Sequence, residues 1–184
     1  MEQESPSKHD VIVAGIGGRG ALITGQLLVE AAASQYNHVL WCPNMTTARR
    51  GAPADCTVVI SDQEIGSPLV AQAETLILVD PSRLKAFEHR VQPAGRIFLE
   101  TSGLKDNVDR TDVEVIKVPG LDTAARLGDT QAGNMVLLGA YVAKTKVISP
   151  DLVEAKLRQK FEGREKILSL NLDAFHEGIK LMRG

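Results

Sequence analysis

The sequence predicts a doubly wound α/β domain with a mostly parallel sheet and C-terminal helices. An apolar run, Val11 to Ala14, leads into a glycine-rich segment and then into apolar residues at helical spacing, which is the pattern of a strand crossing into a helix. Further short runs rich in Val, Ile and Leu recur along the first two thirds of the chain, as expected of strands buried in a parallel sheet. The last third has the pattern of successive helices.

The chain has 184 residues, of which 43% are hydrophobic, so it is long enough for one well-filled core. We expect a mobile N-terminal tail over residues 1–10 and one domain over residues 11–184. The formal charge of −2 gives no long-range attraction to nucleic acid or to an anionic membrane. No apolar run approaches the roughly 20 residues of a bilayer span, and the N-terminus has no signal-peptide core, so we expect a cytoplasmic protein.

The elements of the first half follow from apolar runs and the residues that flank them. The strand Val11–Ala14 leads through glycines to a helix from Arg19 to about Ser34. The second strand is stopped by Pro43, and a long polar loop follows from Asn44 to Ala54. Asp80-Pro81 is a helix start, because Asp can accept orphan amides and Pro fits the first turn. The other expected strands are Val39–Cys42, Cys56–Ser61, Thr75–Val79, Arg96–Glu100 and Val113–Val118.

Four helices are expected in the remainder. Gly128 closes the first of them, and Ser149 opens the third as a cap. The last helix carries an apolar stripe on one face, backed by charge, which predicts packing on the same core. The expected helices are Asp122–Leu127, about Gln131–Lys144, Pro150–Phe161 and Glu165–Leu181. The stripe consists of Leu168, Leu172, Phe175, Ile179 and Met182.

The segment from Gly15 to Gly20 matches the pattern GxGxxG at a strand-to-helix junction, the context that gives this pattern physical meaning. Glycines let the backbone approach a phosphate, and a helix N-terminus offers unpaired amides and a partial positive charge. The alternative is that the glycines only permit a tight turn and close packing of the helix on the sheet. The candidate ligand-binding residues in this segment are Gly15, Gly17, Gly18, Arg19 and Gly20.

A nicotinamide or flavin dinucleotide makes a further demand, an acidic residue near the end of the second strand that binds a ribose hydroxyl. Here no acidic residue follows that strand until Asp55. Arg49, Arg50 and Gly51 come instead, in a loop that leaves the same edge of the sheet as the glycine turn. Guanidinium groups suit phosphate because their donors fork onto pairs of oxygens. The dinucleotide interpretation is therefore weakened, and the alternatives are an anion site or two solvated arginines.

Other reactive residue types form no complete catalytic set. Cys42 and Cys56 border predicted strands and are expected as core thiols, and an iron–sulfur cluster normally needs four thiolates. Asp80 is favoured as a helix cap over a catalytic carboxylate, and Thr101-Ser102-Gly103 as a turn over a ligand contact. The four histidines lack metal-ligand spacing, and no catalytic triad order or HExxH motif is present. We assign this chain no catalytic residue and no metal-binding residue.

An ordered series of motifs resembles the gamma subunit of 2-oxoacid:acceptor oxidoreductases. The resemblance covers residues 11–178, and it is the order and spacing of the motifs that make it specific. The motifs are Gly15-Ile16-Gly17-Gly18-Arg19-Gly20, Trp41-Cys42-Pro43, Arg50-Gly51, Cys56-Thr57-Val58-Val59-Ile60-Ser61, Ile65-Gly66-Ser67-Pro68, Asn134-Met135, Leu138-Gly139-Ala140 and Asn171-Leu172-Asp173-Ala174-Phe175.

Enzymes of that family decarboxylate a 2-oxoacid on thiamine diphosphate, pass electrons through iron–sulfur clusters and transfer the acyl group to coenzyme A (CoA). The resemblance implies a Rossmann-like domain that supports assembly and the CoA site and is not catalytic alone. It also implies that thiamine diphosphate, magnesium and 4Fe-4S clusters reside in partner subunits. These partners are thiamine-binding alpha and beta subunits, a ferredoxin-like delta subunit and, where NAD is the acceptor, a flavin subunit. The amides of Gly17, Gly18 and Gly20, with Arg50, are then candidates for the phosphate or adenylate end of CoA, and such contacts would position the thiol.

Two departures from the family pattern bear on ligand and substrate. The first departure is the loop before Arg50, residues Asn44 to Arg49, where relatives often have a glycine, an aromatic and an acidic segment. This difference favours a less common aromatic substrate, such as phenylglyoxylate or indolepyruvate. The more common substrates are pyruvate, 2-oxoglutarate and branched-chain acids. Arg19 stands where a Gln is common and adds a third cation. The alternatives are a free-standing nucleotide-binding or regulatory module without a redox role, and a purely structural assembly subunit.

Overall fold

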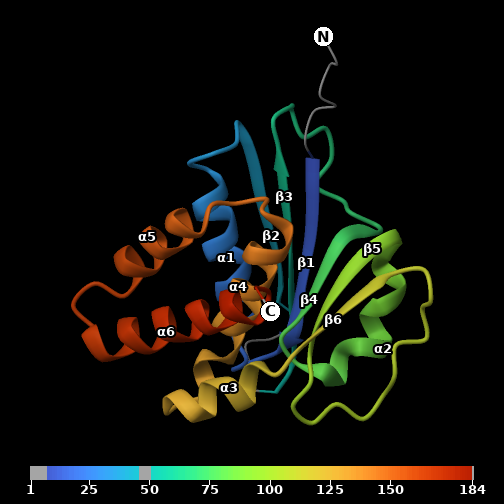
Figure 1. Cartoon of the computed structure of the whole chain (residues 1–184). Helices are drawn as coiled ribbons and strands as arrows, with labels where there is room; N and C mark the ends of the chain where they lie inside the picture. The colour runs from blue at the N-terminus through green and yellow to red at the C-terminus, as the bar shows by residue number, and fades with distance from the viewer. Residues whose placement is uncertain (1–7, 46–50, 184) are drawn as a thin grey trace.

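The computed structural model describes residues 8–45 and 51–183. Within these residues, six strands form one sheet in the order β2-β3-β1-β4-β5-β6 (Figure 1). Strands β1, β4, β5 and β6 run parallel to one another, which confirms the predicted α/β class with a mostly parallel sheet. The strands are β1 (Lys8–Ile16), β2 (His38–Met45), β3 (Pro53–Ser61), β4 (Ala73–Leu78), β5 (Val91–Glu100) and β6 (Glu114–Val118).

Helices cover the two faces of the sheet unequally (Figure 1). Helix α1 and helices α3 to α6 lie on one face, and the short helix α2 lies on the other. The strand order reverses direction at β1, because the chain goes first to β2 and β3 and then returns to β4 on the opposite side of β1. The carboxyl ends of β1 and β4 therefore form the crevice where open α/β sheets bind ligands. The helices are α1 (Ala21–Ala32), α2 (Leu84–Phe87), α3 (Gly120–Leu127), α4 (Gly133–Thr145), α5 (Pro150–Lys160) and α6 (Glu165–Leu181).

The connection between β2 and β3 differs from the prediction. Strand β3 runs antiparallel to both β1 and β2, and β2 continues through Pro43 to Met45. The long polar loop expected over residues 44–54 is thus shorter, because residues at both of its ends belong to a hairpin. Pro43 is tolerated because β2 is an edge strand, where a missing backbone donor need not interrupt the ladder. The connection from Met45 to Pro53 is too short for a parallel crossover, which needs a dozen or more residues.

Most other elements lie close to their predicted positions. Strand β1 begins at Lys8, so its first residues belong to the sheet rather than to the expected N-terminal tail. Gly128, with φ of +119°, ends α3 as predicted, and the carboxylate of Asp80 caps the short 3₁₀ helix Pro81–Arg83. Ser149 occupies the N-cap position of α5 as predicted, but its side chain makes no capping hydrogen bond with the described residues.

Helix α4 lies in the centre of the larger core, and its residues from Gly133 to Val142 are all buried. The apolar stripe of α6 packs against this core, as predicted. Leu172, Phe175 and Ile179 are buried, and the other two stripe residues are partly buried against them. Among the described residues, no helix combines the length and the apolar character needed to cross a bilayer.

Two glycines set the distance between α4 and α6. A Cβ atom added at Gly139 of α4 would overlap the carbonyl oxygen of Phe175, and one added at Gly178 of α6 would overlap the carbonyl oxygen of Val136. Each glycine thus faces backbone of the opposite helix. The crossing is close because neither position carries a side chain, and it holds α4 against the sheet beside the glycine turn.

Candidate functional site

The glycine-rich segment predicted as a phosphate site forms the turn between β1 and α1. Gly18 and Gly20 have φ of +93° and +79°, in the left-handed region that favours glycine. A Cβ atom at Gly15 would lie 2.5 Å from Cγ2 of Val79, so a side chain there would push the turn away from the end of β4. The turn therefore requires glycine at these positions for its own geometry, with or without a ligand.

The tip of the β2–β3 hairpin is fastened to this turn by two backbone hydrogen bonds. The amide of Gly17 donates to the oxygen of Ala52 at 2.8 Å, and the amide of Gly51 donates to the oxygen of Gly17 at 3.1 Å. Gly51 and Ala52 of the hairpin thus both oppose Gly17 of the turn. Together with the φ of +86° at Gly51, this is the arrangement of a G1 bulge. Gly51 is brought to the turn by this bulge. Arg49 and Arg50 lie outside the described residues.

Only some amides of the turn are available to a ligand. The amide of Gly17 is bonded to the hairpin, and the amide of Arg19 donates to the oxygen of Ile16 at 3.1 Å. Among the described residues, the amides of Gly18 and Gly20 donate to no oxygen atom, whereas the amide of Thr24 in α1 donates to the oxygen of Gly20 at 3.0 Å. Free amides at a helix N-terminus attract anions. Of the predicted amide donors, those of Gly18 and Gly20 therefore remain candidates for binding a phosphate, whereas the amide of Gly17 already donates to the hairpin.

The side chain of Arg19 reaches from the turn to the carboxyl end of β4. Its Nε atom lies 3.4 Å from Oδ2 of Asp80, which is almost fully buried. Oδ1 of Asp80 accepts hydrogen bonds from the amide and the hydroxyl of Ser82 at 3.0 and 2.5 Å. Asp80 is thus the helix cap that the sequence predicts, and it also holds Arg19, a contact that sequence reasoning missed. Because a guanidinium carries five N–H donors, this contact leaves donors for a ligand.

Two adjoining hollows open at the turn. The first, which we name the turn pocket, has a volume of about 500 Å³ and is lined by residues that include Gly17, Gly18, Arg19, Gly51, Leu121 and Thr130. The second, the helix groove, has a volume of about 530 Å³ and runs between the start of α1 and helices α4 and α6. They share the wall formed by Ile16, Gly17, Gly18, Asp129 and Gln131. The two hollows therefore form one elongated depression.

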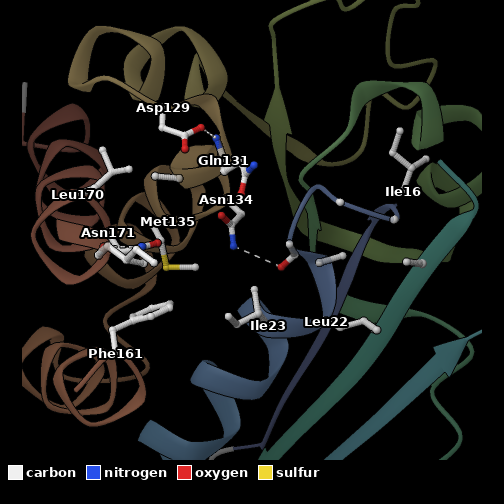
Figure 2. Close-up of a pocket in the computed structure, with 17 residues that line it drawn as sticks. Ile16, Leu22, Ile23, Asp129, Gln131, Asn134, Met135, Phe161, Leu170 and Asn171 are labelled. Atoms are coloured by element: carbon white, nitrogen blue, oxygen red, sulfur yellow. Dashed lines mark hydrogen bonds between the residues drawn. The ribbon is translucent and has the colours of Figure 1, made fainter. Parts of the chain in front are cut away.

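The two ends of this depression differ in polarity. Leu22 and Ile23 of α1 line the groove, and in Figure 2 Met135, Phe161 and Leu170 lie across from Ile23. The turn pocket instead presents backbone amides and Arg19. Asp129 borders both hollows, and its carboxylate accepts a hydrogen bond from the amide of Gln131 at 2.9 Å. A ligand that joins an anionic group to a largely apolar arm fits this arrangement.

Asn134 of α4 joins the groove to the glycine turn. This buried side chain donates from Nδ2 to Oγ1 of Thr24 at 3.0 Å. It also donates to the oxygen of Gly20 at 3.3 Å, the hydrogen bond drawn in Figure 2. A Cβ atom at Gly20 would overlap the Asn134 amide, so the glycine and the asparagine require each other. Sequence reasoning named Asn134 only as part of the resemblance, because a contact across 114 positions leaves no local signal.

Glu100, at the carboxyl end of β5, is a second residue that sequence reasoning missed. Its side chain is fully buried, and it accepts hydrogen bonds from the amides of Ser102 and Leu121 at 2.8 and 2.9 Å. Burial raises the pKa of Glu100, while the amide donors oppose that rise. Leu121 lies in the first turn of α3 and borders the turn pocket, so Glu100 positions one wall of the candidate site.

The cysteines and histidines take no part in this depression. Cys56 is a core thiol, as predicted, and burial raises its pKa to about 11, so it is not a nucleophilic thiolate at neutral pH. Cys42, also expected in the core, is only half-buried because it lies on the edge strand β2. His9 and His176 each contact a glutamate. Over residues 8–45 and 51–183, no three side chains gather as a possible metal site.

Comparison with known families and proteins gives matches over nearly the whole chain. The family model described as pyruvate ferredoxin/flavodoxin oxidoreductase matches residues 10–181. The ketoisovalerate oxidoreductase subunit VorA from Methanothermobacter marburgensis is 31% identical over 174 residues, covering 94% of this chain and 36% of VorA. The 2-oxoglutarate synthase subunit KorC from the same organism is 26% identical over 184 residues, covering 95% of this chain and 97% of KorC. The chain thus spans about a third of VorA and nearly all of KorC.

Two solved structures share the fold. The gamma subunit of a keto/oxoacid ferredoxin oxidoreductase from Geobacter sulfurreducens aligns with a TM-score of 0.81 and 22% identity, over 96% of this chain and 97% of that subunit. The 2-oxoglutarate:ferredoxin oxidoreductase from Magnetococcus marinus, described with 2-oxoglutarate, coenzyme A and succinyl-CoA bound, aligns with a TM-score of 0.88 and 22% identity, over 98% of this chain and 32% of that one. The family match over residues 10–181 and the 31% identity to VorA confirm the resemblance found in the motifs. The chain belongs to the pyruvate ferredoxin/flavodoxin oxidoreductase family.

Proposed function

We propose that this chain is the gamma subunit of a CoA-acylating 2-oxoacid oxidoreductase complex and that its glycine turn holds the phosphates of CoA. The observation that carries the proposal is the turn pocket, where the unbonded amide of Gly18 lies beside the Arg19 side chain, while Gly20, whose amide is also unbonded, borders the adjoining helix groove. Amides at a helix N-terminus and a forked guanidinium are both suited to phosphate oxygens. Arg50 directly precedes the bulge residue Gly51 in the sequence, and we propose it as a further cation for the phosphates.

The helix groove suits the other part of CoA. The pantetheine arm is long and carries no charge, and the groove continues from the turn pocket between apolar side chains such as Leu22 and Phe161. Asp129, at the junction, can accept a hydrogen bond from a hydroxyl or amide of that arm. By binding both parts, the chain would hold the thiol in place for attack on an acyl group formed elsewhere in the complex, which is catalysis by positioning.

The complex requires partners for the chemistry itself. We assign thiamine diphosphate, magnesium and the 4Fe-4S clusters to thiamine-binding alpha and beta subunits and to a ferredoxin-like delta subunit. Thiamine diphosphate supplies the decarboxylation, and the clusters carry the two electrons released per acyl group to ferredoxin, or to NAD through a flavin subunit. The names of the relatives support the existence of partner subunits, since VorA and KorC are both called subunits of oxidoreductase or synthase enzymes.

The substrate is proposed as a 2-oxoacid. VorA and KorC are named for ketoisovalerate and 2-oxoglutarate, so the aromatic substrate favoured by the loop before Arg50 gains no support from them. Because the proposed role of this chain is at the CoA end of the reaction, the proposal does not depend on which 2-oxoacid is used.

Purification of the tagged full chain from its native cells tests the assembly part of the proposal. We expect the chain to elute with partners that contain thiamine diphosphate and iron–sulfur clusters, detected by absorption spectra and by metal and thiamine analysis of the complex. A chain recovered as a monomer that binds a nucleotide would contradict the proposal and support the free-standing regulatory module. A complex that retains full activity after the chain is removed would support a purely structural role.

The variant Arg50→Ala tests the CoA part. In the assembled complex, we expect the KM for CoA to rise about tenfold or more with little change in kcat, because one charge-assisted contact to phosphate is lost. Initial rates at varied CoA and saturating 2-oxoacid measure this. Arg158→Ala, an exposed arginine on α5 outside both hollows, is the matched control and should leave the KM unchanged. An unchanged KM in Arg50→Ala would remove Arg50 from the site.

A further inference from the structure

The directions of three hydrogen bonds determine which way the Asn134 side chain faces. The oxygen of Gly20 accepts from the amide of Thr24 at 3.0 Å, from the hydroxyl of Thr24 at 2.9 Å and from Nδ2 of Asn134 at 3.3 Å. Because the hydroxyl of Thr24 gives its one proton to Gly20, it can only accept from Asn134, at 3.0 Å. Both neighbours therefore need a donor, and the NH₂ group of Asn134 supplies it.

This contact fixes the start of α1. Gly20 directly precedes Ala21, the first residue of the helix, and the peptide group between them is planar. A donor that holds the oxygen of Gly20 therefore also sets the direction of the Ala21 amide, one of the orphan donors at the helix N-terminus. The space beside Gly20 is closed as well, since an added Cβ would overlap Nδ2 of Asn134. Asn134 thus fixes both the position and the orientation of the first peptide group of α1.

The glycine turn is consequently held at two points. At the β1 side, Gly17 is bonded to the tip of the β2–β3 hairpin, and at the α1 side, Gly20 is bonded to Asn134. Gly18 and Arg19 lie between these points. Asn134 belongs to the buried part of α4, which the close crossing with α6 holds in place. The α1 side of the turn is therefore aligned by the core, through one side chain.

We propose that Asn134 is a positioning residue, which holds the glycine turn in the conformation that leaves the amides of Gly18 and Gly20 free for an anion. It acts through the oxygen of Gly20 and not by contact with the anion. The inference rests on the proposed function only for the identity of that anion, the phosphates of CoA. Without a donor at position 134, the start of α1 is released, and the free amides lose the fixed geometry that binding requires.

Kinetics of the assembled complex test this role. In Asn134→Ala, we expect the KM for CoA to rise about fivefold with kcat unchanged, as for loss of one hydrogen bond of average strength. Thr24→Val separates positioning from direct contact, because Thr24 is fully buried and lines neither the turn pocket nor the helix groove. It should raise the KM by a smaller factor, since Asn134 keeps its contact with Gly20. The double variant should rise by less than the product of the two factors, because both act on one network.

Amide resonances of Gly18 and Gly20 report on the turn without CoA. In NMR spectra of the ¹⁵N-labelled full chain, we expect Asn134→Ala and Thr24→Val to shift both resonances from their wild-type positions. Asn107→Ala is the matched control, an exposed asparagine in the connection between β5 and β6. It should change neither these resonances nor the KM for CoA.

Two outcomes would overturn the inference. One is that the resonances of Gly18 and Gly20 stay in place in both variants. The other is a rise in KM in Asn134→Ala that Thr24→Val does not share, because it would mean that Asn134 contacts the ligand directly. If the resonances shift while neither these variants nor Arg50→Ala alters the KM for CoA, the positioning of the turn stands and the proposed function fails.

Discussion

Replacing Gly178 with alanine should lower the free energy of unfolding of this chain by about 3 kcal/mol, the upper part of the range for overpacked cores. The added Cβ atom would overlap the backbone oxygen of Val136 and lie 2.9 Å from the amide nitrogen of Ala140. A backbone group cannot rotate away as a side chain can, so α6 must move off α4. The better helix propensity of alanine offsets only about 1 kcal/mol of this cost. Urea denaturation of the full chain, followed by circular dichroism, measures the change.

The matched control for Gly178→Ala is Gly66→Ala, where an added Cβ would meet no atom within 4 Å. We expect that control to remain within about 0.5 kcal/mol of the wild type. Gly139→Ala faces the same crossing from the other helix and should cost a similar amount, and the double variant should cost less than the sum because both substitutions force the same separation. Equal denaturation midpoints for Gly178→Ala and Gly66→Ala would show that the crossing is not tight.

Replacing Glu100 with glutamine should also cost about 2 kcal/mol of stability, as expected when a buried donor loses its acceptor. The carboxylate accepts hydrogen bonds from two amides, those of Ser102 and Leu121. Glutamine retains one acceptor oxygen and places an NH₂ group against the second amide. Because the Leu121 amide belongs to the first turn of α3, the wall of the turn pocket should shift as well. In the assembled complex, the KM for CoA should therefore rise more than kcat falls.

Glu100 should also leave a signature in the pH dependence of stability. Burial raises its pKa above the usual value of 4.5. The wild type therefore has a contribution to stability below pH 4.5 that is lost as the pH rises through the folded-state pKa, and Glu100→Gln should lack this contribution. Denaturation midpoints measured across the acidic range test this, with the exposed Glu64→Gln as the control that should follow the wild type. A Glu100→Gln variant that stays parallel to the wild type over that range would contradict the argument.

The local pattern of the sequence was enough to predict the elements but not how they pair. The apolar run from Cys56 to Ser61 has the same composition whether its strand is parallel or antiparallel to β1, so its direction had no local signal. Pro43 was taken as a stop because a proline interrupts a central strand, and only the sheet order shows that β2 is at the edge. The predicted connection between Cys42 and Cys56 is long enough for a crossover, so its length did not indicate a hairpin, whereas the connection in the structure, from Met45 to Pro53, is too short for one.

The residues of the candidate site also divide into those that the local sequence predicts and those that it does not. The glycine turn was predictable because its residues are consecutive and its context, a strand followed by a helix, can be recognised locally. Asn134, Glu100 and the contact between Arg19 and Asp80 were not, because each depends on segments that only the folded chain brings together. Asp80 illustrates the limit well. Its capping role follows from the neighbouring proline, whereas its second role toward Arg19 follows from the adjacency of β1 and β4.

The G1 bulge at Gly51 separates residues 46–50, which precede it in the sequence, from the framework of the glycine turn. On the framework side, the hydrogen bonds join Gly17 to Gly51 and Ala52 through backbone atoms alone, so they do not depend on any side chain in residues 46–50. Those five positions can therefore be rewritten, as binding loops are rewritten on an antibody scaffold, while the turn keeps its place. The one condition is a glycine at position 51, since an L-residue at φ of +86° would be strained. Loop grafting between members of the family should accordingly join the segments at this bulge.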